Sequence, residues 1–274
     1  MMRNIAVILA GGTGSRMGSS VPKQFMLLGD RSGAKHPQKL AGRTVIEYSI
    51  DVFDNHPAVD EVAVVVHPDW RQELQAIVER NRWTKLTKII DGGSERYMSS
   101  LNAIMAYIDE SDDTNLLLHD AARPFVSVEI IDRVVAALQC HEAVGVAVPS
   151  TDTVWEVHPD MSGELIVKSK RNASGIPGKA GEERKFVIPR FVARIPERKL
   201  MWRAQTPQAF RLPLIRDAYQ RALQDPQFQA TDDCGVVRKY MPGTKITVVE
   251  GSDRNLKVTT PQDLAALEQI LING

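Results

Sequence analysis

The feature that most constrains this chain is a short apolar run that leads directly into a glycine-rich loop. Residues 5–9 are apolar throughout, which is typical of a buried parallel strand. Residues 10–18 then carry four glycines, whose missing Cβ atoms allow backbone N–H groups to approach phosphate oxygens closely. The apolar run and the glycine-rich loop together predict an α/β protein that binds a phosphorylated ligand where this strand ends.

Two cations accompany the loop, which suggests chemistry in addition to binding. Arg16 lies within the loop and Lys23 follows it shortly. A guanidinium fork and a flexible ammonium can together neutralise phosphates whose negative charge grows in a transition state. A plain glycine turn between a strand and a helix is the simpler alternative, and the two cations make it less attractive.

Two familiar phosphate-binding loops do not fit. A P-loop places lysine and then serine or threonine after its last glycine, whereas Gly18 is followed by two serines. The dinucleotide fingerprint needs glycines spaced more tightly than those here, and it needs an acid after the second strand. The second strand candidate, residues 61–66, ends in His67 and Pro68 instead. An NAD-dependent oxidoreductase is therefore a poor alternative.

Strand-like and helical patterns alternate along most of the chain. The apolar β-rich runs cover residues 5–9, 61–66, 86–90, 115–119 and 143–148. Between them lie helical patterns with one apolar stripe, such as residues 127–139. This alternation predicts a doubly wound, mostly parallel sheet in one domain over residues 1–274, with ligands beyond the carboxyl ends of its strands.

The alternation breaks between residues 150 and 203. Residues 168–184 are charged and glycine-rich without an apolar period, and short strand candidates flank them. We expect a β-arm over residues 151–200, and a smaller polar excursion at residues 29–39.

Composition limits the possible partners. The chain of 274 residues has 34 Lys and Arg residues and 34 Asp and Glu residues, so no bulk charge favours nucleic acid or an anionic membrane. Its two cysteines are far apart and form no C-x-x-C, which argues against a disulfide or a zinc site. No apolar stretch has the length of a signal or membrane-spanning segment. We therefore expect a cytoplasmic enzyme.

Polar motifs follow two further strand candidates. Asp120 and Arg123 come after residues 115–119, where a carboxylate among phosphates would suit Mg²⁺. Arg123 could take a second phosphate or orient Asp120, and a capped turn with an internal ion pair is the alternative. Arg96 and Ser99 open a helical pattern after residues 86–90, and helix N-termini favour anions. These strand ends are expected to share one crevice with the glycine loop.

Taken together, the motifs resemble the 2-C-methyl-D-erythritol 4-phosphate cytidylyltransferase family in order and approximate spacing. They cover residues 9–18, 22–25, 92–96, 119–124, 206–208 and 255–264. The family includes ribitol-5-phosphate cytidylyltransferases. The resemblance implies a Rossmann-like nucleotidyltransferase domain with a protruding β-arm, through which both branches commonly form a homodimer.

The resemblance also implies a role for each matching residue. It implies that Arg16 and Lys23 stabilise the CTP phosphates, and that Arg198 and Lys257 hold the acceptor phosphate. The nucleotide-binding residues would be Ala10, Gly11, Gly12, Gly93, Arg96 and Ser99. The acceptor-binding residues would be Asp120, Arg123, Thr153 and Thr206. Asp120 would also face Mg²⁺, the implied cofactor.

The implied reaction is a direct transfer without a covalent enzyme intermediate. An acceptor phosphate oxygen attacks the α-phosphorus of CTP and pyrophosphate leaves, so positioning and charge stabilisation supply the catalysis. A non-catalytic nucleotide-binding module is a rival from another class. It predicts the loss of a charged catalytic residue, yet Arg16, Lys23, Arg198 and Lys257 are all present.

Departures from the family pattern concern the identity of the substrates, and the one at Ser94 concerns the sugar of the nucleotide. Ser94 stands where many methylerythritol enzymes have an acid, and residues 9–12 and 195–196 are closer to the ribitol branch. Residues 120–123, 205–210 and 255–264 fit the methylerythritol branch. We predict CMP transfer to 2-C-methyl-D-erythritol 4-phosphate in the isoprenoid precursor pathway. The alternative is ribitol 5-phosphate, giving CDP-ribitol for cell-surface polymers.

Overall fold

The structure, a computed structural model, describes residues 2–12, 19–28, 42–159, 165–169, 183–187 and 190–273. These residues form two compact units, each considered by itself. The first comprises Met1–Val148 and Ala204–Gly274, and the second comprises Pro149–Arg203. The excursion expected at residues 29–39 lies outside the described residues.

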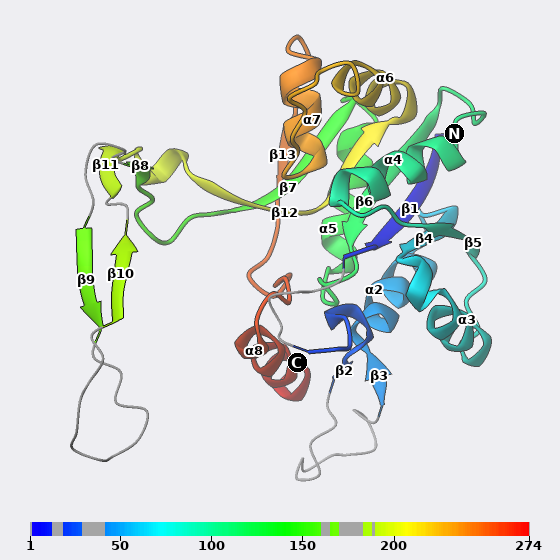
Figure 1. Cartoon of the computed structure of the whole chain (residues 1–274). Coiled ribbons are helices and arrows are strands. Elements are labelled where there is room, and N and C mark those ends of the chain that lie inside the picture. Colours follow the sequence, from blue (N-terminus) through cyan, green and yellow to red (C-terminus); the bar gives the residue numbers. More distant parts are fainter. Residues whose placement is uncertain are drawn as a thin grey trace. The chain divides into compact units, whose positions relative to one another are not determined.

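A seven-stranded sheet forms the centre of the first unit (Figure 1). Its strands, in spatial order, are β13 (Thr247–Glu250), β7 (Ala143–Pro149), β12 (Trp202–Arg211), β6 (Thr114–Asp120), β1 (Arg3–Ala10), β4 (Glu61–Val66) and β5 (Leu86–Asp91). β1 runs parallel to β4 and β6, while β12 runs antiparallel to β6. The predicted doubly wound, mostly parallel sheet is therefore confirmed.

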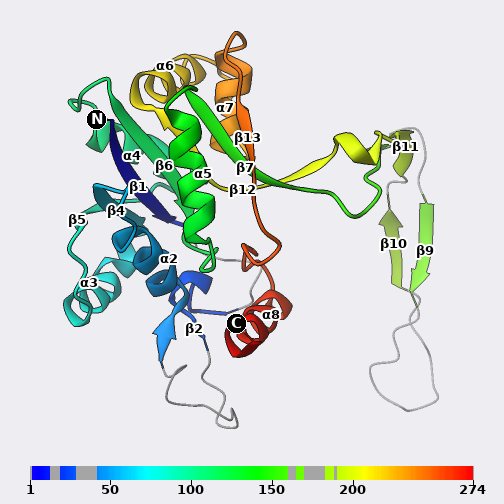
Figure 2. The same cartoon turned by 180° about the vertical axis from the view of Figure 1, so that it is seen from behind.

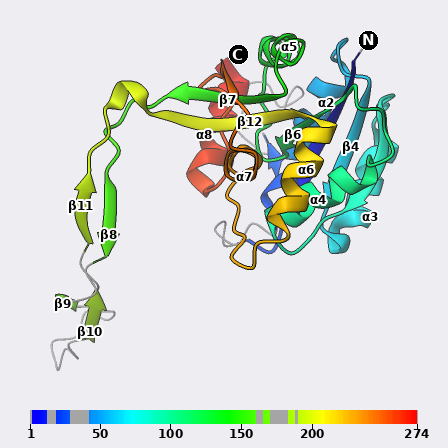
Figure 3. The ribbon, with the colours of Figure 1, turned by 90° about the horizontal axis from the view of Figure 1, so that it is seen from above.

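Helices cover both faces of this sheet, as Figures 2 and 3 show. One face packs against α2 (Val45–Asp54), α3 (Arg71–Arg80) and α5 (Val128–Leu138). The other packs against α4 (Arg96–Ala106), α6 (Leu212–Ala222) and α7 (Asp233–Tyr240). A strand buried on both faces has no polar side to present, which explains the unbroken apolar run of β1.

Alternate residues of β1 divide between the two cores. Ala6 and Ile8 pack with α2 and α5, whereas Ile5, Val7 and Leu9 pack with α4 and α6. This packing fixes the direction of β1 and therefore the place where its glycine loop begins.

Short elements complete the first unit around the end of β1. The 3₁₀ turn η2 (Lys23–Phe25) carries the lysine of the loop motif, and the ring of Phe25 stacks on Trp70 with centroids 5.0 Å apart. The strands β2 (Leu27–Leu28) and β3 (Arg43–Thr44) pair antiparallel. The last helix, α8, spans Pro261–Asn273, and Asp263 accepts a hydrogen bond from the N–H of Thr260 at 2.7 Å.

The second unit contains two antiparallel ribbons. One pairs β8 (Glu156–Pro159) with β11 (Arg190–Arg194), and the other pairs β9 (Leu165–Ser169) with β10 (Glu183–Val187). A short 3₁₀ turn, η4 (Arg198–Leu200), follows β11. The region where we expected the β-arm, residues 151–200, falls within this unit.

Candidate active site

Four strand ends meet at one edge of the sheet. β1 and β6 are parallel neighbours in which Leu9 lies beside Asp120, and the N–H of Ala121 donates to the Leu9 carbonyl at 3.0 Å. β4 lies between β1 and β5, and the N–H of Gly92, just after β5, donates to the carbonyl of Val66 at the end of β4 at 2.7 Å. The carboxyl ends of these strands therefore open onto the same space.

A cavity of about 310 Å³ occupies this edge. The residues that line it include Ala10, Gly11, Gly12, Lys23, Gln24, Arg96, Ser99, Asp120 and Lys257. Five of the six predicted nucleotide-binding residues are among them, together with two predicted catalytic lysines and the predicted metal-facing aspartate. The structure thus brings together residues that lie up to about 250 positions apart in the sequence.

Gly11 and Gly92, from two neighbouring loops, are closely packed. A Cβ on Gly11 would lie 2.4 Å from the Ser99 hydroxyl oxygen, and one on Gly92 would lie 3.1 Å from the Cα of Gly11. The remaining nucleotide-binding prediction, Gly93, donates its N–H to the Ser99 hydroxyl at 3.3 Å. Ser99 therefore connects the loop after β5 to the loop after β1.

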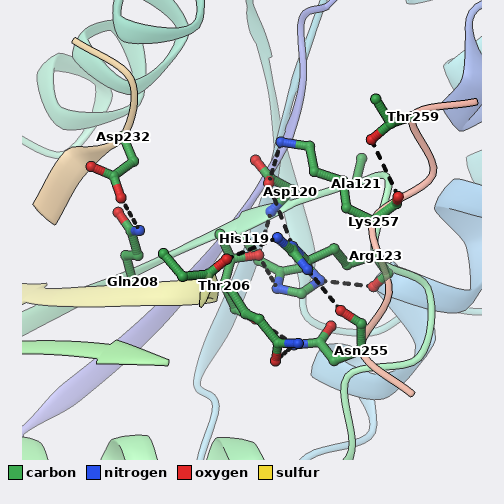
Figure 4. A network of polar contacts seen from close by, with 12 residues as sticks. His119, Asp120, Ala121, Arg123, Thr206, Gln208, Asp232, Asn255, Lys257 and Thr259 are labelled. Atoms are coloured by element: carbon green, nitrogen blue, oxygen red, sulfur yellow. Dashed lines mark hydrogen bonds and ion pairs between the residues drawn. The ribbon is translucent and has the colours of Figure 1, made fainter. Parts of the chain in front are cut away.

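Asp120 is the charge centre of the site (Figure 4). Its carboxylate accepts a hydrogen bond from Lys257 Nζ at 2.7 Å, and Arg96 Nε and Arg123 Nε lie 3.5 and 3.7 Å from it. Burial alone would raise the pKa of this carboxyl, but the charges of Arg96, Lys257 and Arg123 hold it well below its usual range. Asp120 is therefore a carboxylate at working pH.

A second buried carboxylate, Asp233, holds Arg96 from the other side. It is fully buried, and its Oδ2 lies 2.8 Å from Arg96 Nη1, while the Tyr219 hydroxyl donates to its Oδ1 at 2.7 Å. Burial would lower the pKa of Arg96, but the charges of Asp233 and Asp120 raise it above its usual value. Arg96 is therefore fixed as a cation in the cavity wall.

Asp233 was not predicted from the sequence. The available signal was the acidic pair Asp232 and Asp233 at the start of a helical pattern. Asp232 does cap α7 by accepting from the N–H of Gly235 at 2.8 Å. Nothing in that local pattern indicates that Asp233 pairs with Arg96, which belongs to α4.

Arg123 lies beside Asp120, yet its guanidinium is mainly bound to backbone. Nη1 donates to the carbonyl of Asn255 at 2.7 Å and Nη2 donates to the carbonyl of Ala204 at 3.3 Å. Its exposed fraction is 9%, and it is not among the residues that line the cavity. The two roles predicted for Arg123, taking a second phosphate or orienting Asp120, stay predictions.

Thr206 and His119 form a directed chain of hydrogen bonds behind Asp120 (Figure 4). A backbone carbonyl can only accept, so His119 Nε2, which lies 3.0 Å from the Arg123 carbonyl oxygen, must carry the proton. The Nδ1 of this neutral imidazole then accepts from the Thr206 hydroxyl at 3.0 Å. The Thr206 oxygen in turn accepts from the N–H of Asp120 at 3.0 Å. Thr206 therefore tethers the backbone of Asp120.

His119 predicts a loss of stability in mild acid. Burial lowers the pKa of His119 to about 4 from the ordinary value of 6.5. Between these values the unfolded chain binds a proton that the folded chain does not, so the free energy of unfolding falls as pH falls, by up to about 1.4 kcal/mol per pH unit. Urea unfolding measured between pH 7 and pH 4 should show this slope, and His119→Gln should flatten it. An unchanged slope in the variant would contradict the assignment.

Besides Gly93, Arg123 and Thr206, which are not among the lining residues, three further predicted residues are not placed at this cavity. Arg16 lies outside the described residues. Thr153 and Arg198 belong to the second unit, where Arg198 Nη1 donates to the carbonyl of Thr151 at 3.4 Å. Their predicted roles toward the acceptor and the phosphates stay predictions.

A Mg²⁺ ion at this site would need oxygen ligands. Within the described ranges, no three His, Cys, Asp or Glu side chains cluster closely enough to hold a metal ion by themselves. Mg²⁺ commonly binds through one or two carboxylates together with substrate phosphates. Asp120 lines the cavity together with Glu95, and the anionic carboxylate of Asp120 fits that mode, in which the substrate supplies most of the ligands.

Known proteins are similar to this chain over nearly its whole length. A family model described as 2-C-methyl-D-erythritol 4-phosphate cytidylyltransferase matches residues 4–174 and 183–273. A protein of that name from Thermobifida fusca (strain YX) is 42% identical over 272 residues, which cover 99% of this chain and 94% of the relative. The bifunctional ribulose 5-phosphate reductase/CDP-ribitol pyrophosphorylase Bcs1 of Haemophilus influenzae is 35% identical over 268 residues, covering 98% of this chain and 48% of that protein.

Solved structures share the fold. The crystal structure of 4-diphosphocytidyl-2C-methyl-D-erythritol synthase from Anaerococcus prevotii superposes with a TM-score of 0.73 at 24% identity, covering 98% of both chains. None of the helices in the described part of the chain combines the length and apolar character needed to span a membrane.

Proposed function

The chain belongs to the 2-C-methyl-D-erythritol 4-phosphate cytidylyltransferase family, and we propose that it transfers CMP from CTP to 2-C-methyl-D-erythritol 4-phosphate with release of pyrophosphate. The observation that carries this proposal is the cavity at the carboxyl edge of the sheet, where Lys23, Arg96, Asp120 and Lys257 meet the glycine loop. Phosphoryl transfer needs little covalent chemistry from a protein, so such a cationic, glycine-lined cavity suits it.

In the proposed reaction an oxygen of the acceptor phosphate bonds to the α-phosphorus of CTP. The bond from that phosphorus to the bridging oxygen breaks, and pyrophosphate leaves with the electron pair. Lys23 and Arg16 would stabilise the charge that collects on the leaving group. Lys257 and Arg198 would hold the acceptor phosphate, while Arg96, Ser99 and the glycines would bind the nucleotide.

We propose Mg²⁺ as the cofactor and Asp120 as the residue that would hold it. When bound, the ion would neutralise part of the triphosphate charge. Asp120 also accepts a hydrogen bond from Lys257 in the protein alone, so it keeps that lysine in the cavity. Arg123, Thr206 and Thr153 would support the acceptor side, the first two through their contacts around Asp120.

A release assay tests the function. Purified protein with CTP, MgCl₂ and one polyol phosphate should release pyrophosphate, and kcat/KM should be about 100-fold higher for 2-C-methyl-D-erythritol 4-phosphate than for ribitol 5-phosphate. The ribitol acceptor is kept as a second candidate because of the Haemophilus influenzae relative, although the match to the Thermobifida fusca protein is stronger. Faster turnover of ribitol 5-phosphate would establish that candidate, and no release with either acceptor would refute both.

We also propose a homodimer formed through the second unit. This unit carries a concentration of exposed apolar side chains, with exposed fractions of 59% for Trp155, 59% for Phe191, 58% for Ile195 and 63% for Leu200. Exposed apolar clusters of this kind mark protein interfaces, and aromatic residues are enriched there.

We place the protein in the cytoplasm because Cys140 and Cys234 are both free thiols.

A charge placed on this unit should weaken the dimer. We expect Phe191→Asp to raise the dimer dissociation constant at least about 100-fold, because it buries an unpaired carboxylate in an apolar interface. Analytical ultracentrifugation over a concentration series measures this dissociation constant. Leu223→Asp is the matched control, since Leu223 is exposed to 52% in the first unit. A dimer that is equally sensitive to both changes, or to neither, would argue against this interface.

A further inference from the structure

We propose that Gln24 is a positioning residue for the triphosphate: its side-chain amide orients the peptide groups of the loop after β1. This inference rests on the proposed use of CTP. Gln24 lines the cavity and has an exposed fraction of only 2%. Its Nε2 donates to the carbonyl of Ala10 at 2.7 Å and to the carbonyl of Gly12 at 2.9 Å.

The chemistry of these contacts leaves one arrangement for the amide. Both partners are backbone carbonyls, which only accept, so the nitrogen of the amide must face them. A primary amide has two hydrogens, and each carbonyl receives one. The two hydrogen bonds therefore use the full donor capacity of Gln24 on either side of Gly11.

Fixing a carbonyl also fixes the next N–H. The peptide group is planar and trans, so its C=O and N–H point in opposite directions. With the Ala10 carbonyl bound to Gln24, the N–H of Gly11 points away from Gln24. Gly11 lines the cavity, so the direction of its N–H, which shares a peptide group with the bound Ala10 carbonyl, determines which donors a phosphate meets there.

Neighbouring contacts hold both Gln24 and the loop that it binds in place. On one side the loop is packed against α4, since a Cβ on Gly11 would lie 2.4 Å from the Ser99 hydroxyl. On the other side Gln24 belongs to η2, which is anchored by the stacking of Phe25 on Trp70. Lys23 is in the same turn, so Gln24 also fixes the spacing between that lysine's backbone and the loop.

The test uses substitutions that keep the length of the side chain. Gln24→Glu places a carboxylate opposite two carbonyls, and Gln24→Met removes the donors without adding charge. For both we expect kcat/KM for CTP to fall about 100-fold, and calorimetry should show affinity for inorganic pyrophosphate with MgCl₂ falling at least about 10-fold. Gln75→Glu is the control, because Gln75 is exposed on α3. It should behave like the unmodified chain.

A pH series distinguishes positioning from general support of the fold. Protonation of the carboxylate introduced by Gln24→Glu would restore one donor, so pyrophosphate affinity relative to the unmodified chain should rise as pH falls from 8 to 5.5, while Gln24→Met should show no recovery. Pyrophosphate affinities equal to those of the unmodified chain in both variants would overturn the proposal. It would also be overturned if both variants lost affinity for CMP and for pyrophosphate to the same extent at every pH. If pyrophosphate binding responds as expected but no polyol phosphate is turned over, the proposed function fails and the role of Gln24 stands.

Discussion

Lys23→Ala will lower kcat by about 100-fold to 1,000-fold and change the KM for CTP much less. Lys23 lines the cavity beside the glycine loop, in a turn that is anchored by Phe25. The charge on the departing pyrophosphate is largest in the transition state, so a cation placed there stabilises the transition state more than bound CTP. Its loss should therefore appear in kcat.

Steady-state kinetics with saturating acceptor measures this effect. Lys245→Ala is a suitable control because Lys245 is an exposed lysine of the same unit. Lys23→Arg keeps the charge but alters its geometry, and we expect it to recover part of the lost kcat. A kcat close to that of the unmodified chain in Lys23→Ala would remove Lys23 from the catalytic group.

The second large effect concerns Asp120→Asn, which should reduce both stability and activity. Its carboxylate lies against Lys257, Arg96 and Arg123, and these cations hold its pKa below its usual range. Replacing it with a neutral amide leaves these cations without their shared partner, and breaking a buried ion pair in this way costs about 3 to 5 kcal/mol. Because Arg96 and Lys257 both line the cavity, we expect kcat/KM to fall by at least about 1,000-fold.

Urea unfolding and steady-state kinetics measure the two parts separately. Asp112→Asn, on an exposed aspartate of the same unit, is the control and should change neither.

The pH dependence of the free energy of unfolding adds an independent check. A carboxyl with a lowered folded pKa contributes stability that is present above its unfolded value of 3.8 and is lost as pH falls below it. The variant should lack that acid loss, and a variant as stable as the unmodified chain would contradict the assigned charge balance.

Apolar runs were a reliable guide to the strands that they cover. The runs at residues 5–9, 61–66 and 115–119 correspond to β1, β4 and β6, each buried on both faces. β12 was missed because it is a polar strand in the middle of the sheet. Its buried side chains, such as Gln208, are satisfied by partners from other elements, here Asp232 and the N–H of Asp233. A strand stabilised in this way has no apolar pattern to detect.

The predicted site residues are likewise indicated by a local sequence pattern, whereas the unpredicted ones depend on tertiary partners. Asp120 ends β6 and Arg96 begins the helix that follows β5, and parallel strands bring their carboxyl ends to one edge, so the meeting of the two residues could be inferred. Asp233, His119 and Gln24 act through partners that only the tertiary fold supplies. Gln24 stood next to Lys23 in a motif that was already noted, yet its two carbonyl partners depend on the path of the loop.

The forced tautomer of His119 makes this imidazole a natural spectroscopic reporter for the interior of the site. One ring nitrogen is protonated and hydrogen-bonded to a carbonyl, while the other accepts from Thr206, so the two should give widely separated nitrogen resonances. Thr206 also binds the N–H of Asp120. A ligand that shifts the backbone of Asp120 would therefore be visible by isotope labelling of a single buried ring, without a dye or a tag in the cavity.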